Sequence, residues 1–112
     1  MIRGSFSFGE VLLCELAFST APGSKKRPVL VVADFGDADL LVAPITSHPI
    51  RGEFDLAVQE WKKAGLKLPS TIRTNKLGTV AKSCVIRNFG KLSGTDVQPV
   101  QGALRRLFER IA

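Results

Sequence analysis

The sequence predicts a β-dominated α+β domain, in which short strands close into a small barrel or half-barrel carrying a short helix and a C-terminal helix. Short apolar runs rich in Val and Leu alternate with turn-forming Gly, Asp and Pro along most of the chain, which is typical of strands. Only the last segment repeats apolar residues at helical spacing. Strands this short usually close on themselves because closure removes exposed edges.

Length and composition favour one domain in a reducing compartment. The 112 residues, 45% of them hydrophobic, suffice for a single compact domain over residues 1–112. Cys14 and Cys84 form neither a CxxC pair nor a Cys/His metal spacing, so we expect two small buried side chains. No segment approaches the ~20 apolar residues of a membrane span. Polar residues also interrupt any signal-peptide core, so we expect a cytoplasmic protein without a membrane partner.

The charge balance favours an anionic partner. Sixteen Lys and Arg against ten Asp and Glu leave a formal net charge of +6. Such an excess in a small domain is typical of proteins that bind nucleic acid. Many small basic proteins bind nothing anionic, so the charge alone does not decide the function.

Turn-forming residues separate the expected strands and mark the loops. Residues 1–7 read as a lead-in, and residues 19–26 read as a loop because Ser, Thr, Pro and Gly dominate them. Continuous apolar character in the first strand predicts burial on both faces. In chain order, the expected strands are residues 11–18, 29–33, 40–43, 54–56, 71–77 and 83–92.

Two segments carry helical patterns. Residues 58–64 fit two turns of helix that end at Gly65, a residue suited to the left-handed conformation after a helix. The C-terminal helix has one apolar stripe, and either Ser93 or Thr95 can cap it. We favour Thr95, because it forms a capping box with Gln98 and leaves Pro99 near the first turn. The stripe consists of Val97, Val100, Leu104, Leu107, Phe108 and Ile111.

The hairpin formed by residues 29–33 and 40–43 brings a basic cluster and a hydroxyl cluster together. Lys25, Lys26 and Arg27 precede its first strand, and Thr46 and Ser47 follow its second. In an antiparallel pair, the start of one strand lies beside the end of the other. The sequence therefore predicts a phosphate-binding site where three cations face two hydroxyls.

A set of ordered motifs resembles the PemK/MazF family of toxins from bacterial toxin–antitoxin pairs. The segments are Gly9-Glu10-Val11, then KKRPVLVV, LLVAPITS, EWKKAGL and PSTIR, and finally GKLS before a terminal helix. Each motif is weak by itself, but their order and spacing match over roughly residues 9–108. The resemblance implies an SH3-like barrel of the MazF/CcdB type that forms a homodimer.

The resemblance also implies the activity and its residues. Family members are mostly metal-independent, sequence-selective endoribonucleases, so this chain is expected to cleave single-stranded RNA, to stop growth and to need no cofactor. Arg27 and Thr46 match the family's catalytic Arg and Thr. The family's Arg-x-Asp reads Arg73-Thr74-Asn75 here, so a role for that Asp does not carry over. The expected RNA-binding residues are Lys25, Lys26, Ser47, Arg73, Asn75 and Lys76.

RNA cleavage needs few protein groups, because the 2′-hydroxyl of RNA is itself the nucleophile. His48 is the only histidine, so the chain has no two-histidine acid–base pair. An Arg fork can neutralise charge that develops on phosphate, and a Thr hydroxyl can donate one more hydrogen bond. The expected products are a 2′,3′-cyclic phosphate and a 5′-hydroxyl.

Each candidate residue also has a structural interpretation. Arg27 can serve as an ion-pair partner at a strand edge, and Thr46 with Ser47 can simply close a turn. Arg73 can equally pair within the fold, Lys25 and Lys26 can be solvated, and Trp61 can pack on the barrel. At the level of function, a gyrase-poison-type toxin and a catalytically silent RNA-binding module are the alternatives.

The expected protein partners are a second copy of the chain and an antitoxin. Phe35, Phe54 and Phe89 lie near predicted strand ends and are candidates for exposed apolar surface in a homodimer. Opposite charge would attract an acidic, partly disordered antitoxin segment that folds as it binds. Operator DNA is expected to be contacted only through the antitoxin.

Overall fold

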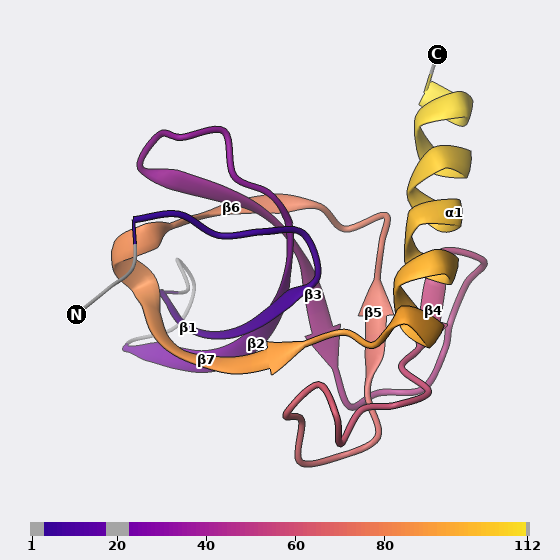
Figure 1. Ribbon diagram of the computed structural model, residues 1–112, viewed down its shortest axis with the longest axis horizontal. Helices are drawn as coiled ribbons and strands as arrows, with labels where there is room; N and C mark the ends of the chain where they lie inside the picture. Colours follow the sequence, from indigo (N-terminus) through magenta and orange to yellow (C-terminus); the bar gives the residue numbers. More distant parts are fainter. Residues whose placement is uncertain (1–3, 18–22, 112) are drawn as a thin grey trace.

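The computed structural model describes residues 4–17 and 23–111, which form a strongly curved antiparallel sheet with one long helix beside it (Figure 1). In chain order the strands are β1 (Glu10–Ala17), β2 (Ser24–Ala33), β3 (Asp39–Thr46), β4 (Asp55–Ala57), β5 (Thr71–Arg73), β6 (Gly78–Ala81) and β7 (Val85–Lys91). A 3₁₀ turn, η1 (Lys82–Cys84), precedes β7, and the helix α1 (Gly94–Ile111) ends the chain.

The predicted hairpin is confirmed as β2 and β3, which pair antiparallel with Leu30 opposite Ala43. Both strands are longer than their apolar runs. β2 begins at Ser24 because β1 pairs with it as far as Ala17 opposite Ser24. The prediction of a loop over residues 19–26 is therefore wrong for Lys25 and Lys26, which lie in a strand. The part of that prediction on residues 19–22 lies outside the described residues.

β3 is the central strand of the sheet. Its first half pairs with β6, with Leu40 opposite Val80, and its end pairs with β5, with Ile45 opposite Ile72. The strand order is β4-β5-β3-β2-β1-β7, and irregular register between β1 and β7 increases the curvature there. Strands β7, β1, β2, β3 and β6 curl into the expected SH3-like barrel, although the described ladder stays open between β6 and β7.

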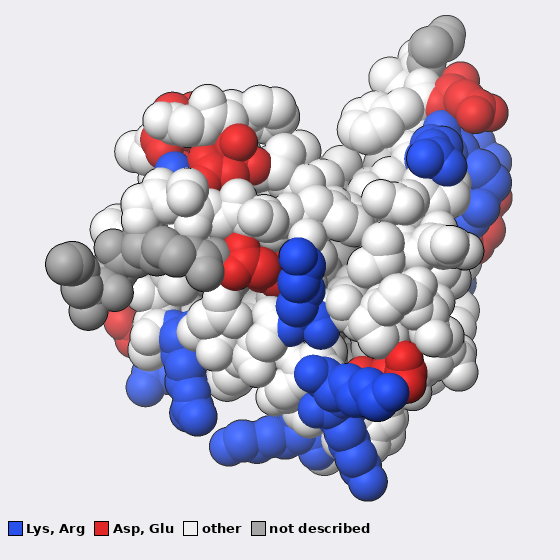
Figure 2. Space-filling model, viewed as in Figure 1, with Lys and Arg blue, Asp and Glu red and all other residues white. Residues whose placement is uncertain are grey.

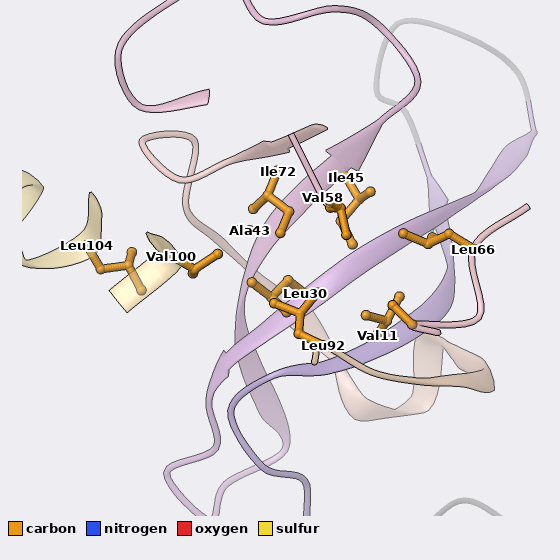
Figure 3. Packing of buried hydrophobic residues seen from close by; sticks show 11 residues of the cluster. Val11, Leu30, Ala43, Ile45, Val58, Leu66, Ile72, Leu92, Val100 and Leu104 are labelled. Atoms are coloured by element: carbon orange, nitrogen blue, oxygen red, sulfur yellow. The ribbon is translucent and has the colours of Figure 1, made fainter. Parts of the chain in front are cut away.

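Alternation of side chains along the strands gives the sheet two apolar faces. Val11 and Leu12 are both fully buried, so the predicted burial of β1 on both faces is confirmed at its start. One cluster fills the inside of the barrel, formed by Leu12, Cys14, Val29, Val31, Leu40 and Val42. The other packs α1 and residues 58–66 against the outer face (Figure 3). Its members include Val11, Leu30, Ala43, Ile45, Ile72, Leu92, Val100 and Leu104.

The two cysteines lie inside the domain as free thiols. Cys14 is fully buried, as predicted, whereas Cys84 is only partly buried. Burial raises the pKa of the Cys14 thiol to about 11, with a smaller contribution from Cys84. Such a thiol is un-ionised at neutral pH and acts as a small apolar side chain.

The predicted helix over residues 58–64 is wrong, because the segment forms a series of turns. Two helical turns give few backbone hydrogen bonds to offset the cost of helix nucleation. The segment ends as a helix would, with the N–H of Gly65 donating to Lys62 and that of Leu66 donating to Trp61, both at 3.0 Å. The predicted left-handed position of Gly65 is confirmed by its φ of 85°.

The preferred start of the C-terminal helix at Thr95 is also wrong. The Ser93 carbonyl accepts from the N–H groups of Asp96 and Val97, both at 3.0 Å, so Ser93 occupies the N-cap position and Pro99 lies inside the helix. Tertiary contacts explain why the helix begins before Thr95. The buried Asp96 carboxylate in the first turn accepts from the N–H groups of Gln59 at 2.7 Å and Glu60 at 2.9 Å.

The segment after the helix-like turns differs from the single strand predicted over residues 71–77. β5 ends at Arg73, because the next residue, Thr74, turns inward and is fully buried. Its hydroxyl and its N–H both donate to the carbonyl of Phe54, at 2.7 and 3.0 Å. The chain then enters β6, a short strand without a clear apolar run, which the sequence did not predict.

Candidate functional site

Arg27 and Thr46 meet at the open end of the β2–β3 hairpin. The last ladder pair is Val29 opposite Pro44, and Arg27 and Thr46 lie two residues further along their strands and line the same cavity. The β2–β3 ladder ends at the Val29–Pro44 pair, and on their other edges Arg27 pairs with Cys14 on β1 and Thr46 with Thr71 on β5. The hairpin geometry expected from the sequence is therefore present.

A cavity of about 330 Å³, called the Arg27 cavity below, lies at this point. Its floor is apolar, and no carboxylate belongs to its described lining. Three cations in a site without carboxylates create a positive potential that favours a phosphate. The polar side chains that line it are Lys26, Arg27, Lys67, Thr46, Ser47 and Ser70.

Arg27 is exposed at the rim of the cavity. Among residues 4–17 and 23–111, no carboxylate forms an ion pair with its guanidinium. The described contacts therefore do not support the interpretation of Arg27 as an ion-pair partner at a strand edge. Its fork of N–H donors is available for a bidentate contact with phosphate oxygens.

The Thr46 hydroxyl is held by a local turn. Its Oγ1 accepts a hydrogen bond from the N–H of His48 at 3.1 Å, so the turn-closing interpretation is correct for this side chain. A hydroxyl has one hydrogen to donate besides its two lone pairs, and the turn occupies only a lone pair. Thr46 can therefore close the turn and also donate into the Arg27 cavity, whereas His48 is not part of the described lining.

Four of the other predicted RNA-binding residues do not line this cavity. Lys25 is exposed on β2, next to Lys26 but outside the lining. Arg73, Asn75 and Lys76 line a second cavity, called the Arg73 cavity, which also has a volume of about 330 Å³. The structure thus brings Lys26, Arg27, Thr46 and Ser47 together and places the remaining candidates elsewhere on the surface.

The Arg73 cavity is basic but contains internal ion pairs. The Nε atom of Arg73 lies 3.5 Å from Oδ1 of the buried Asp55, its partner across the β4–β5 ladder. Arg110 pairs with Glu53 at 2.8 Å and lies over the ring of Phe54. The structural interpretation of Arg73 is therefore correct in part, while Arg51, Lys76 and Arg110 add positive charge to the same cavity.

The loop over residues 66–70 supplies site residues that the sequence did not single out. Lys67 and Ser70 line the Arg27 cavity because the following strand, β5, pairs with the end of β3. Ser70 donates its hydroxyl hydrogen to the carbonyl of Leu68 at 2.8 Å. The sequence did predict a strand directly after this loop, but it did not show that this strand pairs with β3 and so brings the loop to the Arg27 cavity.

Lysine and arginine side chains gather along the lower edge of the face shown in Figure 2, and others lie along α1.

Among the described residues, no group of three His, Cys, Asp or Glu side chains is placed to hold a metal ion. None of the described helices is both long and apolar enough to cross a membrane.

Comparisons with known proteins agree with this architecture. The chain is similar to an endoribonuclease solved in complex with its cognate antitoxin from a mycobacterial species, with a TM-score of 0.73 and 16% identity over 94% of this chain and 96% of that chain. It is also similar to the Mycobacterium tuberculosis toxin MazF-mt6, with a TM-score of 0.67 and 22% identity over 88% of this chain and 96% of the other. At these identities the likeness establishes the fold alone. A comparison with curated protein sequences found no significant match.

The family assignment comes from the sequence itself. Residues 7–108 match the family described as PemK-like, MazF-like toxin of type II toxin-antitoxin system. The match spans almost the whole domain, including both strands of the hairpin, the loop over residues 66–70 and most of α1. The chain therefore belongs to the family of PemK-like and MazF-like toxins of type II toxin–antitoxin systems.

Proposed function

We propose that this toxin is a metal-independent, sequence-selective endoribonuclease that cleaves single-stranded RNA, an mRNA interferase in the cytoplasm. The observation that carries the proposal is the Arg27 cavity, where a guanidinium without a carboxylate partner among the described residues lies near the Thr46 hydroxyl and further cations. Both relatives described above are named as an endoribonuclease or a MazF toxin, which supports the same activity.

The proposed reaction uses the RNA's own nucleophile. The ribose 2′-oxygen attacks the adjacent phosphorus and loses its proton, while the bond from phosphorus to the 5′-oxygen breaks and that oxygen gains a proton. The products are a 2′,3′-cyclic phosphate and a 5′-hydroxyl. Arg27 would hold two phosphate oxygens with its fork, and Thr46 would donate to a third position as charge develops. Lys26 and Ser47, which lie next to Arg27 and Thr46 in the sequence, would contact the same phosphate.

Further RNA contacts are proposed outside the Arg27 cavity. Lys25 extends the basic edge of β2, and the Arg73 cavity offers Arg73, Asn75 and Lys76 to more distant phosphates. Asn75 does not line the Arg27 cavity, so within one chain it contributes to binding rather than to the reaction. The RNA would be single-stranded, because bases must be unstacked to be read.

The proposed assembly is a homodimer that an acidic antitoxin segment neutralises, with operator DNA contacted only through the antitoxin. Phe35 is 77% exposed, as the dimer argument expected, and the apolar Phe108 and Ile111 are exposed at the end of α1. The expectation was wrong for Phe54, which is 6% exposed because Arg110 covers its ring, and Phe89 is half-buried.

The test is incubation of the purified toxin with a long RNA in excess EDTA, followed by mapping of the fragment ends. We expect cuts at one recurring short sequence, each leaving a 2′,3′-cyclic phosphate. Cleavage that requires added magnesium would contradict the proposal. Binding without any cleavage would instead identify a silent RNA-binding module.

A further inference from the structure

A third cavity, the Trp61 cavity, opens beside the Arg27 cavity. It has a volume of about 570 Å³, within the range of ~300–1,000 Å³ that is typical of small-molecule sites. Its walls come from three separate parts of the chain: residues 49–50, residues 57–59 with Trp61, and residues 69–71. Trp61 and Ile50 supply its largest apolar side chains, and no carboxylate belongs to its described lining.

The two cavities adjoin each other. Ser70 lines both, and its neighbours divide between them, Leu68 lining the Arg27 cavity and Pro69 the Trp61 cavity. Thr46 and Thr71, one from each lining, are paired across β3 and β5, and paired strands lie about 4.8 Å apart. A chain held by its phosphate at Arg27 can therefore place a neighbouring group in the Trp61 cavity without crossing intervening protein.

The fold fixes the position of Trp61. Its carbonyl accepts the N–H of Leu66 at 3.0 Å, which closes the turn, and the neighbouring Glu60 N–H is held by Asp96 of α1 at 2.9 Å. The side chain is half-buried, with one part packed against the outer core and another part lining the cavity. An aromatic side chain held in this way needs little ordering when a ligand stacks on it.

Basic side chains lie around this aromatic surface. The Lys62 ammonium is 5.4 Å from the centre of the Trp61 ring, and Lys67 lines the adjoining cavity. Aromatic surfaces combined with cations along a backbone path are how proteins bind single-stranded nucleic acid, with bases stacked and phosphates paired. The charge and the shared wall thus favour a nucleotide over an apolar peptide as the occupant.

We propose that the Trp61 cavity binds the base of a nucleotide adjacent to the cleaved phosphate, stacked on Trp61 and flanked by Ile50. This inference rests on the proposed endoribonuclease function and adds a specificity subsite to it. The Arg27 cavity would bind the reacting phosphate, while the Trp61 cavity would select the base beside it.

Trp61 is the only tryptophan in the chain, which also contains no tyrosine, so its fluorescence reports on this cavity alone. The cleaved bond is first mapped in a long RNA, and an oligonucleotide across it is made with a 2′-deoxyribose at the cut position to prevent reaction. We expect this oligonucleotide to quench the fluorescence of the wild-type toxin. A series in which one abasic site moves along the oligonucleotide should lose the quenching at a single position next to the cut.

Variants separate stacking from folding. Trp61→Leu should weaken binding of the intact oligonucleotide by about 5- to 150-fold, the range for loss of one stacked base, but not binding of the oligonucleotide that is abasic at the critical position. Ile50→Ala, at a side chain that is 55% exposed, should weaken the intact complex and keep the melting temperature. Ile86→Ala, at a 47% exposed position on β7, is the matched control and should change neither.

The outcomes distinguish this inference from the function on which it rests. If the wild type cuts no RNA, the proposed function fails. If the RNA is cut but no abasic position removes the quenching, or Trp61→Leu binds every oligonucleotide as the wild type does, the subsite is wrong. Quenching by poly-glutamate together with none by RNA would assign the cavity to a protein partner and overturn the inference.

Discussion

Arg27 on β2 and Thr46 on β3 line one cavity, because the register that pairs Val29 with Pro44 brings these two side chains to the same end of the hairpin. The chain reverses between them through a turn that side chains stabilise. Asp34 accepts the N–H of Gly36 at 2.9 Å, and Asp37 accepts that of Asp39 at 3.0 Å. The site therefore depends on a hairpin whose register is fixed far from the site itself.

The contacts of Asp34 predict a specific loss of stability in acid. Hydrogen bonds from the Gly36 N–H, the Lys82 ammonium and the Phe6 N–H lower the pKa of Asp34 from 3.8 to about 2. The stabilisation is fully present above pH 3.8 and is lost as the pH falls through about 2, below which the carboxyl binds a proton in the folded state as well as in the unfolded state. Asp34→Asn should thus lower stability at pH 6 and flatten its decline between pH 4 and 2, measured by urea unfolding.

The matched control for this change is Asp37→Asn, which lies in the same turn but is exposed and forms no ion pair with Lys82 among the described contacts. It should retain the decline of the wild type. An Asp34→Asn protein whose stability falls as steeply as that of the wild type between pH 4 and 2 would show that another group is responsible.

The surroundings of Gly65 predict a large loss of stability when a single methyl group is added there. Its φ is 85°, and a Cβ atom there would overlap the carbonyl oxygen of Phe89 on β7. Gly65→Ala should cost about 2–5 kcal/mol in unfolding free energy, combining left-handed strain of ~1–2 kcal/mol with a steric clash of ~1–3 kcal/mol. Gly36→Ala is the control, since Gly36 has a φ of 86° with open space around it, and should show only the strain. Equal losses for the two variants would argue against the close approach of the turn to β7.

The buried Asp96 carboxylate links α1 to the turn that carries Trp61, so its removal should lower the stability of the protein. Asp96→Ala removes a buried carboxylate and leaves the N–H groups of Gln59 and Glu60 without their acceptors, so we expect a loss of about 2–4 kcal/mol in guanidinium unfolding. Thr95→Ala, an exposed neighbour in the same helical turn, should change stability by less than ~0.5 kcal/mol. A larger loss at Thr95 than at Asp96 would restore Thr95 as the helix cap.

Much of this architecture was predictable because its signals are local. The apolar runs of β2 and β3 and the Asp- and Gly-rich turn between them identify a hairpin, and a hairpin by itself brings Arg27 towards Thr46. The terminal helix was equally readable from its apolar stripe. Its start was not, because Asp96 is held by backbone groups of Gln59 and Glu60, far away in the sequence.

The other differences between the predicted and the observed structure also come from contacts between residues that are distant in the sequence. Residues 58–64 have a helical pattern, but contacts with Asp96 and the close approach of Gly65 to β7 hold them as turns. Neither Lys67 nor Ser70 was predicted as a site residue, and both reach the Arg27 cavity only through the pairing of β5 with β3. The separation of Arg73 from Arg27 likewise depends on which strands become neighbours, which a single sequence does not encode locally.

The salt dependence of RNA binding tests which cations contact phosphate. For single-stranded RNA, each lost contact should reduce the slope of log binding constant against log salt by about 0.7. We expect this change for Lys26→Ala in the Arg27 cavity and for Lys76→Ala in the Arg73 cavity, measured with an uncleavable oligonucleotide. Lys91→Ala, outside both cavities, should keep the wild-type slope. An unchanged slope for Lys76→Ala would mean that the RNA does not reach the Arg73 cavity.

The most direct test of catalysis at the Arg27 cavity is single-turnover cleavage of one RNA oligonucleotide by folded Arg27→Ala, Arg27→Lys and Thr46→Val proteins. Thr46→Val keeps the shape and removes one donor, so we expect the rate to fall by about 10²–10³-fold. Arg27→Lys keeps the charge but loses the bidentate fork, and should be nearly as slow as Arg27→Ala. Cleavage at the wild-type rate by both Arg27→Ala and Thr46→Val would place the active site elsewhere on the molecule.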